Sequence, residues 1–330
     1  MHIQEQNKNL HIPVMKEEII NYLNLNYGDI VIDATFGRGG HSLEILQRIG
    51  ERGFLLAIDQ DPDAIEYGKN LLKNSLNVSF YHNNFIRLSE VWEQWKKETF
   101  IGKNEIINKK NIAPNAILFD LGISSPQIDN QDRGFSFSKD GPLDMRMNKF
   151  AKTTAAELVN TLSKEELKNI LKDFGEERYA SRIAQAIIGA RKNKVILSTR
   201  VLANIIKHAS PDKDFRKKQD TIVRCFQAIR IAVNDELTAL RKSLQQAIEI
   251  LKSEGILAVI SFHSLEDRIV KRFFKTEDKG CTCPANFLLC TCGGKSKINI
   301  ITKKPIRPSA EELEINPRAR SALLRVCQKI

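Results

Sequence analysis

No apolar run in this 330-residue sequence approaches the length that a bilayer-spanning helix requires, and low-complexity tracts are absent. The N-terminal stretch lacks the basic start and the apolar segment of a secretory signal. We therefore expect a cytoplasmic protein with no membrane partner. Hydrophobic residues at 42% and charged residues at 28% match ordinary globular composition, which argues against disorder. The length suits one large domain plus a smaller unit.

Acidic residues are outnumbered by basic ones, 40 against 51, which gives a formal net charge of +11. Such a balance favours a polyanionic partner, because Lys and Arg neutralise phosphates and release their counterions. A basic surface without any specific partner would have the same composition. The charge is therefore informative only beside a catalytic motif.

Strand and helix signals alternate along the first part of the chain, and the strand signals return near its end. A glycine-rich loop at 36–41 follows the first strand, and Asp61 with Pro62 is well placed to begin the helix after the second. This order predicts an α/β fold with a doubly wound, parallel sheet, in which the last strand also suits an antiparallel direction. The expected strands are 30–32, 54–58, 78–81, 116–119, 256–261 and 321–326.

Helical patterns replace this alternation in the middle of the chain. Two capping boxes, Thr154 with Glu157 and Ser163 with Glu166, announce successive helices. A single long helix is expected from Thr221 through Leu244. We therefore predict a helical domain inserted into the α/β domain, with the divisions 1–136, 137–218 and 219–330.

The loop at 36–41 and the acid that ends the second strand are typical of a nucleoside-cofactor site. Glycines let a cofactor approach the backbone, and Asp59 can accept both hydroxyls of a ribose. Asp33 at the end of the first strand belongs to the same arrangement. A dehydrogenase is disfavoured because Ser42 occupies the position of the third glycine in the dinucleotide-binding pattern.

The fourth strand ends in Asp120, and Ser124, Ser125, Pro126 and Gln127 follow closely. A carboxylate, two hydroxyls and a proline-constrained turn therefore lie at the carboxyl edge, where open α/β sheets bind ligands. We expect this edge to be the reactive one. A turn that merely ends the strand would account for the same Ser-Ser-Pro tripeptide.

Nine short strings occur along nearly the whole chain: HIPV at 11–14, DATFGRGGHS at 33–42, LAIDQDP at 56–62, DLGISSPQ at 120–127, RGFSF at 133–137, GPLDMRM at 141–147, FQAIRI at 226–231, SFHSLEDR at 261–268 and NPRARS at 316–321. In this order they closely resemble the RsmH (MraW) family of bacterial 16S rRNA (cytosine-N4)-methyltransferases. The resemblance implies a class I (Rossmann-like) S-adenosylmethionine-dependent methyltransferase with an inserted all-helical domain for substrate recognition. It also implies methylation of N4 of a P-site cytidine in 16S rRNA of the small ribosomal subunit.

The resemblance also implies roles for individual residues. From their place at the reactive edge, rather than from the resemblance, Asp120 and Ser125 are the candidate catalytic residues. The residues implied to contact S-adenosyl-L-methionine are Gly39, Gly40 and His41 on the methionine side, Asp59 on the ribose, Phe85 beside the adenine, and Asp120 and Gln127 near the sulfonium.

The partner is expected to be 16S rRNA or a small-subunit particle, and a homodimer is left open. Candidate RNA contacts are Arg133, Arg146, His263 and Arg268, although each could instead form an intramolecular salt bridge. Phe135 and Phe137 could stack on the target base or pack locally. Two other functions stay open: an N-methyltransferase for a small molecule or protein amine, and a non-catalytic RNA-binding factor.

Four cysteines form two Cys-Thr-Cys triplets, at 281–283 and 290–292. Four thiolates could hold a structural zinc, but zinc ribbons usually have two residues between paired cysteines and each pair here has one. We therefore predict no metal site, with Cys281, Cys283, Cys290 and Cys292 as reduced thiols in a loop.

Overall fold

The structure is a computed structural model, and it describes residues 13–100, 112–211, 214–281, 283, 292 and 294–330. The chain divides into two compact units. We call the first the sheet unit, which comprises the described residues up to Gly122 together with 237–330. The second, the helical unit, spans 123–236. Among the described residues, no helix is both long and apolar enough to cross a bilayer.

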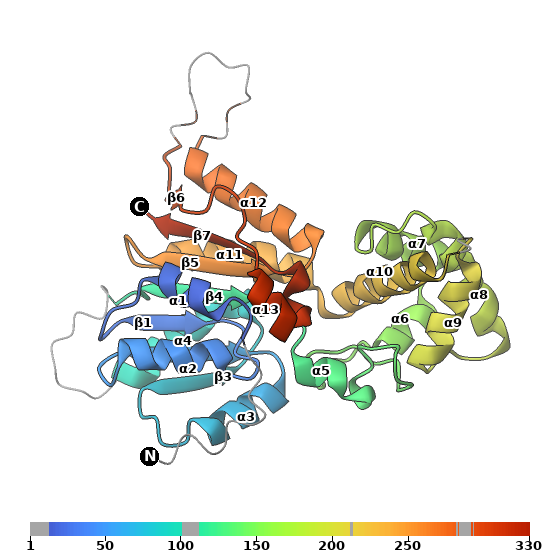
Figure 1. Ribbon diagram of the computed structural model, residues 1–330, viewed down its shortest axis with the longest axis horizontal. Helices are drawn as coiled ribbons and strands as arrows, with labels where there is room; N and C mark the ends of the chain where they lie inside the picture. Colours follow the sequence, from blue (N-terminus) through green and yellow to red (C-terminus); the bar gives the residue numbers. More distant parts are fainter. Residues whose placement is uncertain (1–12, 101–111, 212–213, 282, 284–291, 293) are drawn as a thin grey trace. The chain divides into compact units, whose positions relative to one another are not determined.

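A seven-stranded sheet lies at the centre of the sheet unit (Figure 1). Its strand order is β3-β2-β1-β4-β5-β7-β6, and the first five strands are parallel. β7 runs antiparallel to both of its neighbours, β5 and β6. The predicted doubly wound sheet with an antiparallel last strand is therefore confirmed. The strands are β1 Ile30–Asp33, β2 Phe54–Asp59, β3 Val78–His82, β4 Ala116–Asp120, β5 Ile256–Ser261, β6 Ile298–Ile300 and β7 Leu323–Lys329.

Helices cover both faces of this sheet, because parallel strands bury side chains on both sides. Along β1, Val31 packs into one core and Ile32 into the other, as the two-residue period of a strand requires. The core on one face includes side chains of α4, α11 and α12, and the core on the other includes those of α1 and α2. The helices of the sheet unit are α1 Lys16–Leu23, α2 Gly40–Ile49, α3 Pro62–Leu71, α4 Leu88–Phe100, α11 Glu236–Ile250, α12 Ser264–Lys279 and α13 Ala310–Ile315.

The helical unit has a separate apolar core, to which Leu167, Ile183 and Phe226 contribute. Of the two predicted capping boxes, the one at Ser163 and Glu166 forms with its reciprocal pair of bonds. At the other, Thr154 Oγ1 accepts from the Glu157 amide as an N-cap. Its helices are α5 Ser125–Asp129, α6 Ala155–Thr161, α7 Lys164–Asp173, α8 Ala180–Asn193, α9 Thr199–Ala209 and α10 Phe215–Asn234.

Two sequence-based expectations about this unit need correction. The single long helix expected through Leu244 is wrong, because Asp235 adopts a left-handed conformation with φ 49° and separates α10 from α11. The unit also extends beyond the expected segment 137–218 at both ends. At one end Ile123 packs against its core, and at the other the last turns of α10 contribute Ile229.

Candidate active site at the carboxyl edge of the sheet

Three parallel strands of the sheet unit end in a carboxylate: β1 in Asp33, β2 in Asp59 and β4 in Asp120. β1 lies between β2 and β4. The connection after β1 leads to β2 on one side, and the later connection after β3 leads to β4 on the other side. This is the topological switch point, where open α/β sheets form a crevice outside the strand ends. The sequence predicted this edge, and the strand order confirms that the three acids share it.

The glycine-rich loop between β1 and α2 is held in place by one aromatic side chain and by backbone contacts. Phe36 is almost fully buried, and its ring meets Phe80 edge-on with the centroids 5.2 Å apart. Gly39 has φ 73°, and a Cβ atom there would lie 2.6 Å from the Phe36 ring. At Gly40 a Cβ would lie 2.9 Å from Pro13. Glycine is therefore required at these positions by the fold of the loop itself.

Asp33 supports the loop from below. Its Oδ2 accepts a 2.6 Å hydrogen bond from the Ser42 hydroxyl, and its Oδ1 accepts a 3.1 Å bond from the Thr35 amide. The side chain is almost fully buried, and burial raises its pKa to about 6. Asp33 therefore ties the end of β1 to the start of α2.

Asp59 holds the other side of the same loop. Its Oδ2 accepts a 2.7 Å bond from the Gly37 amide, and its Oδ1 accepts a 2.8 Å bond from the Asp61 amide. Burial raises the pKa of Asp59 to about 7, although both amide bonds oppose the shift. Each carboxylate oxygen has two lone pairs, so both oxygens retain acceptor capacity for the hydroxyls of a ribose.

Asp120 lies beside His41, the second residue of α2. The Nε2 atom of His41 is 3.6 Å from Oδ2 of Asp120, while the backbone amide of Asp120 donates to Thr35 Oγ1 at 2.6 Å. Oδ1 of Asp120 is buried and has no hydrogen-bond partner among the described residues. Burial, with the nearby charges of Asp33 and Glu266, raises the pKa of Asp120 to about 8.

Phe85 opens a short 3₁₀ turn, Phe85–Arg87, shortly after β3. Its ring is partly buried and meets Phe119 of β4 edge-on, with centroids 5.6 Å apart. Phe85 thus lies beside the strand ends of the sheet unit. Its contact with the adenine of the cofactor stays a prediction. Two further residues position the carboxylates: Thr35 accepts from the Asp120 amide, and Ser42 donates to Asp33. Apart from their place around the glycine-rich loop, no sequence signal indicated either residue.

The predicted residues at the start of the helical unit form a helix cap. Ser125 is the first residue of α5, and Gln127 is buried. The side-chain Oε1 of Gln127 accepts a 3.0 Å bond from the Ser124 amide. The structure thus gives Gln127 a capping function. The catalytic role of Ser125 and the cofactor contact of Gln127 stay predictions.

Arg133 and Arg146, both predicted to contact RNA, bond to their own unit. The Arg133 guanidinium donates to the carbonyl oxygens of Arg146 and Met147, at 3.0 and 2.8 Å. Arg146 grips Asp144 through two nitrogens, at 2.8 and 2.7 Å. These bonds are the intramolecular alternative considered for both residues, and an RNA contact by either stays a prediction.

The two phenylalanines that were candidates for base stacking pack locally. Phe135 is buried in the core of the helical unit, and Phe137 meets Phe226 with ring centroids 5.2 Å apart. Both rings therefore take part in local packing, and stacking of either ring on the target base stays a prediction.

His263 and Arg268 belong to the first two turns of α12 in the sheet unit. His263 is the N-cap of the helix, and its Nε2 lies 3.2 Å from Oε1 of Glu266. Buried Glu266 also accepts a 2.8 Å bond from the Phe262 amide. Sequence reasoning missed this cap, because histidine is not among the residues that usually cap helices. Arg268 lies on the exposed side of α12.

The whole chain matches a known family. The model of the MraW methylase family aligns with residues 8–330. The chain belongs to the MraW methylase family. Membership confirms the predicted methyltransferase activity and the predicted cofactor, S-adenosyl-L-methionine. Two curated relatives, each called ribosomal RNA small subunit methyltransferase H, come from Halothermothrix orenii and Caldicellulosiruptor saccharolyticus. They are 47% and 46% identical over 97% of this chain, which covers 98% and 99% of their lengths.

Solved structures of this fold are more distant in sequence. An rRNA methylase from Streptococcus thermophilus aligns with 97% of the chain and 99% of its own, at 9% identity and a TM-score of 0.41. The fold of the present chain is therefore assigned from the strand order and register of its own sheet.

The carboxyl edge of this methylase fits its cofactor. Gly39 and Gly40 let the loop pack closely beside the strand ends, and Asp59 has lone pairs to spare for a ribose. The partnerless Oδ1 of Asp120 is an acceptor in a site where three acids have raised pKa values. Such a site favours a cationic ligand, because a positive charge relieves the repulsion among the carboxylates. S-adenosyl-L-methionine carries an electrophilic methyl group on a positively charged sulfonium.

Proposed function

We propose that this methylase transfers a methyl group to the N4 amine of a P-site cytidine in 16S rRNA of the small ribosomal subunit. The observation that carries this proposal is the buried Oδ1 of Asp120 at the carboxyl edge of the sheet, which has no hydrogen-bond partner among the described residues. It supplies an acceptor for an N–H group beside residues that fit the methyl donor. The names of the curated relatives support an rRNA of the small subunit as the substrate.

The proposed mechanism rests on positioning by Asp120. The lone pair on N4 of cytosine is conjugated with the ring, so the amine is a poor nucleophile. Asp120 Oδ1 accepts one N–H and holds the nitrogen in line with the methyl group, which raises the share of reactive geometries. Bound S-adenosyl-L-methionine would supply the methyl group, with the new bond to N4 replacing the methyl–sulfur bond. The proton leaves N4 afterwards, to the Asp120 carboxylate or to water.

His41 has a positioning role in this mechanism. It lies 3.6 Å from the other oxygen of Asp120 and is itself almost fully buried. It restricts rotation of the carboxylate, so that the acceptor keeps one orientation. A fixed acceptor costs little reorganisation when the amine binds.

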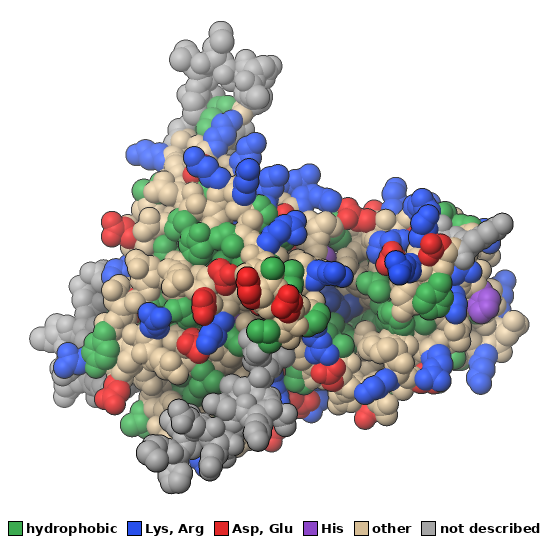
Figure 2. Space-filling model, viewed as in Figure 1, with side chains coloured by type: hydrophobic (Ala, Val, Ile, Leu, Met, Phe, Trp, Pro, Cys, Tyr) green, Lys and Arg blue, Asp and Glu red, His purple; other side chains and the backbone are tan. Residues whose placement is uncertain are grey.

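Recognition of RNA is supported by a basic stripe on α12, which we define as Arg268, Lys271, Arg272, Lys275 and Lys279. These positions recur at three- and four-residue intervals, so they share one face of the helix. All five are exposed, and Figure 2 shows Lys and Arg side chains gathered over this helix. A row of cations on one face can follow a phosphate backbone without reading its sequence.

The experiment is a transfer assay with labelled S-adenosyl-L-methionine and small subunits from a strain that lacks the enzyme. We expect label in 16S rRNA, and nucleoside mass spectrometry should find it as N4-methylcytidine. Label on cytosine C5, on a protein or on a small molecule would refute the assigned substrate. Binding to the subunit without any transfer would favour a non-catalytic assembly factor.

Two comparisons refine the assignment. Naked 16S rRNA in place of the subunit reports whether the assembled particle is the substrate. Ser125→Ala and Gln127→Ala test the two residues of the helical unit, and loss of transfer with unchanged folding would support their predicted roles. The cytoplasm, where ribosomal subunits are assembled, stays the predicted location, and sedimentation of the purified enzyme distinguishes monomer from homodimer.

A further inference from the structure

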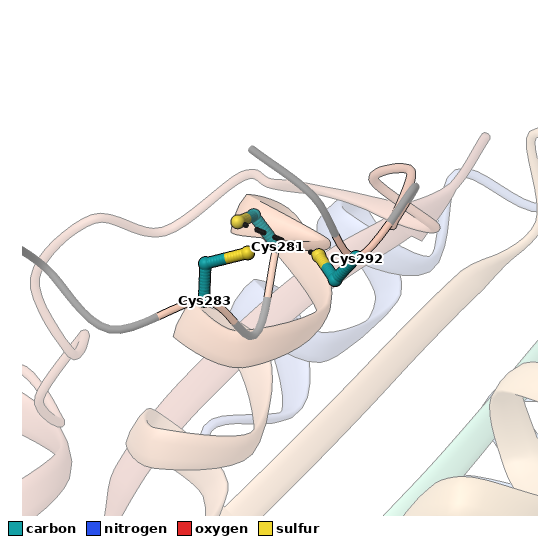
Figure 3. Close-up of side chains that lie close together, drawn as sticks. All are labelled: Cys281, Cys283 and Cys292. Atoms are coloured by element: carbon teal, nitrogen blue, oxygen red, sulfur yellow. Dashed lines mark hydrogen bonds between the residues drawn. The ribbon is translucent and has the colours of Figure 1, made fainter. Parts of the chain in front are cut away.

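Three cysteine side chains lie together in the sheet unit, in the segment between α12 and β6. Cys281 and Cys283 follow the end of α12, and Cys292 precedes β6. The sulfur atoms of all three lie within 4.8 Å of one another. Figure 3 shows Cys283 and Cys292 turned toward Cys281 from the two sides of this segment. Cys290, the fourth cysteine of the two triplets, lies outside the described residues.

The spacing of the sulfur atoms suits a shared metal ion. Sγ of Cys292 is 3.6 Å from Sγ of Cys281, whereas a disulfide would require about 2.05 Å. Zinc binds thiolates at about 2.3 Å, so two sulfur ligands of a tetrahedral zinc are about 3.8 Å apart. The observed separation is close to that value.

The backbone closes the base of this segment independently of the cysteines. Gly280 has φ 65°, and a Cβ atom there would lie 2.2 Å from the carbonyl carbon of Lys295. A Cβ on Gly294 would lie 2.0 Å from the carbonyl oxygen of Gly280. Two strands of backbone thus pass in direct contact at two glycines. Residues with side chains at these positions would push the cysteines on either side apart.

Hydrogen bonds extend this closed base toward the sheet. The Lys297 amide donates to the Glu277 carbonyl oxygen at 3.0 Å, and the two side chains form an ion pair at 3.0 Å. The Ile300 amide donates to Oδ1 of Asp278 at 3.3 Å. The thiols therefore stand on a base that is built without them. A preformed base reduces the ordering cost that metal binding would otherwise have to offset.

We propose that Cys281, Cys283 and Cys292 bind one thiophilic divalent cation, Zn²⁺, with three thiolates. This proposal replaces our sequence-based expectation of no metal site. That expectation rested on the single residue between the two cysteines of each Cys-Thr-Cys triplet. In the structure the ligands come from both sides of the closed base, so tetrahedral geometry does not depend on the spacing within one pair.

The site is structural rather than catalytic. α12 has 16 residues and is therefore about 24 Å long. His263 at its start follows β5 at the carboxyl edge, whereas the three thiols lie beyond its other end. The ion would cross-link the two sides of the segment and hold it at the end of the basic helix.

The test measures metal on the full-length, folded protein under anaerobic, reducing conditions. We expect about one zinc per chain, released when a mercurial reagent modifies the thiols. Replacement of zinc by Co²⁺ should give the intense thiolate-to-cobalt charge-transfer absorption of a tetrahedral sulfur site. Cys281→Ser, Cys283→Ser and Cys292→Ser should each weaken zinc affinity by at least the roughly 10- to 100-fold that loss of supporting contacts causes.

Cys225→Ala is the matched control, because Cys225 is buried in the core of the helical unit and belongs to no thiol cluster there. It should keep one zinc per chain. Circular dichroism verifies that every variant is folded. Absence of both stoichiometric zinc and the cobalt charge-transfer band in wild-type protein would overturn the proposal. A Cys281–Cys292 disulfide that persists under the same reducing conditions would overturn it as well. Neither outcome bears on methyl transfer, which is assayed separately.

Discussion

His41 Nε2 lies 3.6 Å from Asp120 Oδ2, which joins the start of α2 to the end of β4 at the reactive edge. The other carboxylate oxygen of Asp120 is buried without a hydrogen-bond partner among the described residues. Oδ2 thus lies beside an imidazole, whereas Oδ1 has acceptor capacity that no described residue uses. This division of the carboxylate is the basis of the proposed positioning of the amine.

Asp120→Asn should lower the single-turnover rate of methyl transfer roughly 100-fold. The positive charge of the bound sulfonium favours the ionised form of Asp120, whose pKa is raised in the protein alone, and the amide cannot supply that charge. The shape of the side chain is retained, so the protein should fold normally. Rapid-quench measurements with saturating cofactor and subunits provide the rate. An unchanged rate would remove Asp120 from the proposed mechanism.

The same substitution should make stability less dependent on pH. The pKa of Asp120 is about 8 in the folded protein against an ordinary 3.8, so the folded state retains a proton that the unfolded state releases. The free energy of unfolding of wild type therefore falls as pH rises from about 4 to about 8. Because the side chain is partly exposed, we expect Asp120→Asn to gain only about 1–2 kcal/mol over wild type across this range.

Urea unfolding at several pH values measures this difference. The control is Asp63→Asn, since Asp63 lies on the exposed side of the first turn of α3. The change of this difference with pH should be larger for Asp120→Asn than for the control. A flat difference for Asp120→Asn would contradict a raised pKa.

Asp59→Ala should weaken cofactor binding by about 10- to 100-fold, because it removes a charged acceptor and releases the amides of Gly37 and Asp61. Calorimetric titration with S-adenosylhomocysteine measures the affinity directly. Asp59→Asn keeps one acceptor oxygen, so its cofactor affinity should lie between those of wild type and Asp59→Ala. Equal affinities in wild type and Asp59→Ala would exclude the ribose contact.

Gly39→Ala should destabilise the glycine-rich loop by about 1–2 kcal/mol, since an alanine at φ 73° is strained and its Cβ would meet Phe36. Cofactor affinity should fall with it. The matched control is Gly189→Ala at an exposed position of α8, where no heavy atom outside the neighbouring helix backbone lies within 4 Å of the added Cβ. That substitution should raise stability by up to about 1 kcal/mol. Thermal unfolding distinguishes the two.

Reversing charge on the basic stripe, with Lys271→Glu and Lys275→Glu together, should weaken binding to the small subunit and flatten its salt dependence. Each lost phosphate contact should reduce the slope of log affinity against log salt by about 0.7–0.9. The control is Lys252→Glu, an exposed lysine outside α12. An identical slope in both variants would show that the stripe does not contact RNA.

Much of the sheet and part of the site could be predicted because their signals are local. Apolar runs ending in an acid mark strands whose ends share one edge, and glycines between strand and helix mark a close backbone approach. This reasoning placed Asp59, Asp120 and the loop at 36–41 correctly. The family resemblance added Phe85 and Gln127, which no local pattern distinguishes from a packed aromatic and a helix cap.

Other features depend on packing between distant segments, so no sequence pattern indicated them. Arg133 donates to a backbone carbonyl oxygen and Arg146 to Asp144, and both bonds need the folded helical unit. The contact between the rings of Phe137 and Phe226 needs it as well. The pKa of Asp120 likewise depends on burial beside other acids. The thiols of Cys281 and Cys292 meet where two glycines let separate backbone segments pass in direct contact. Local chemistry specifies elements and their ends, whereas desolvation and contacts distant in sequence arise only from the folded chain.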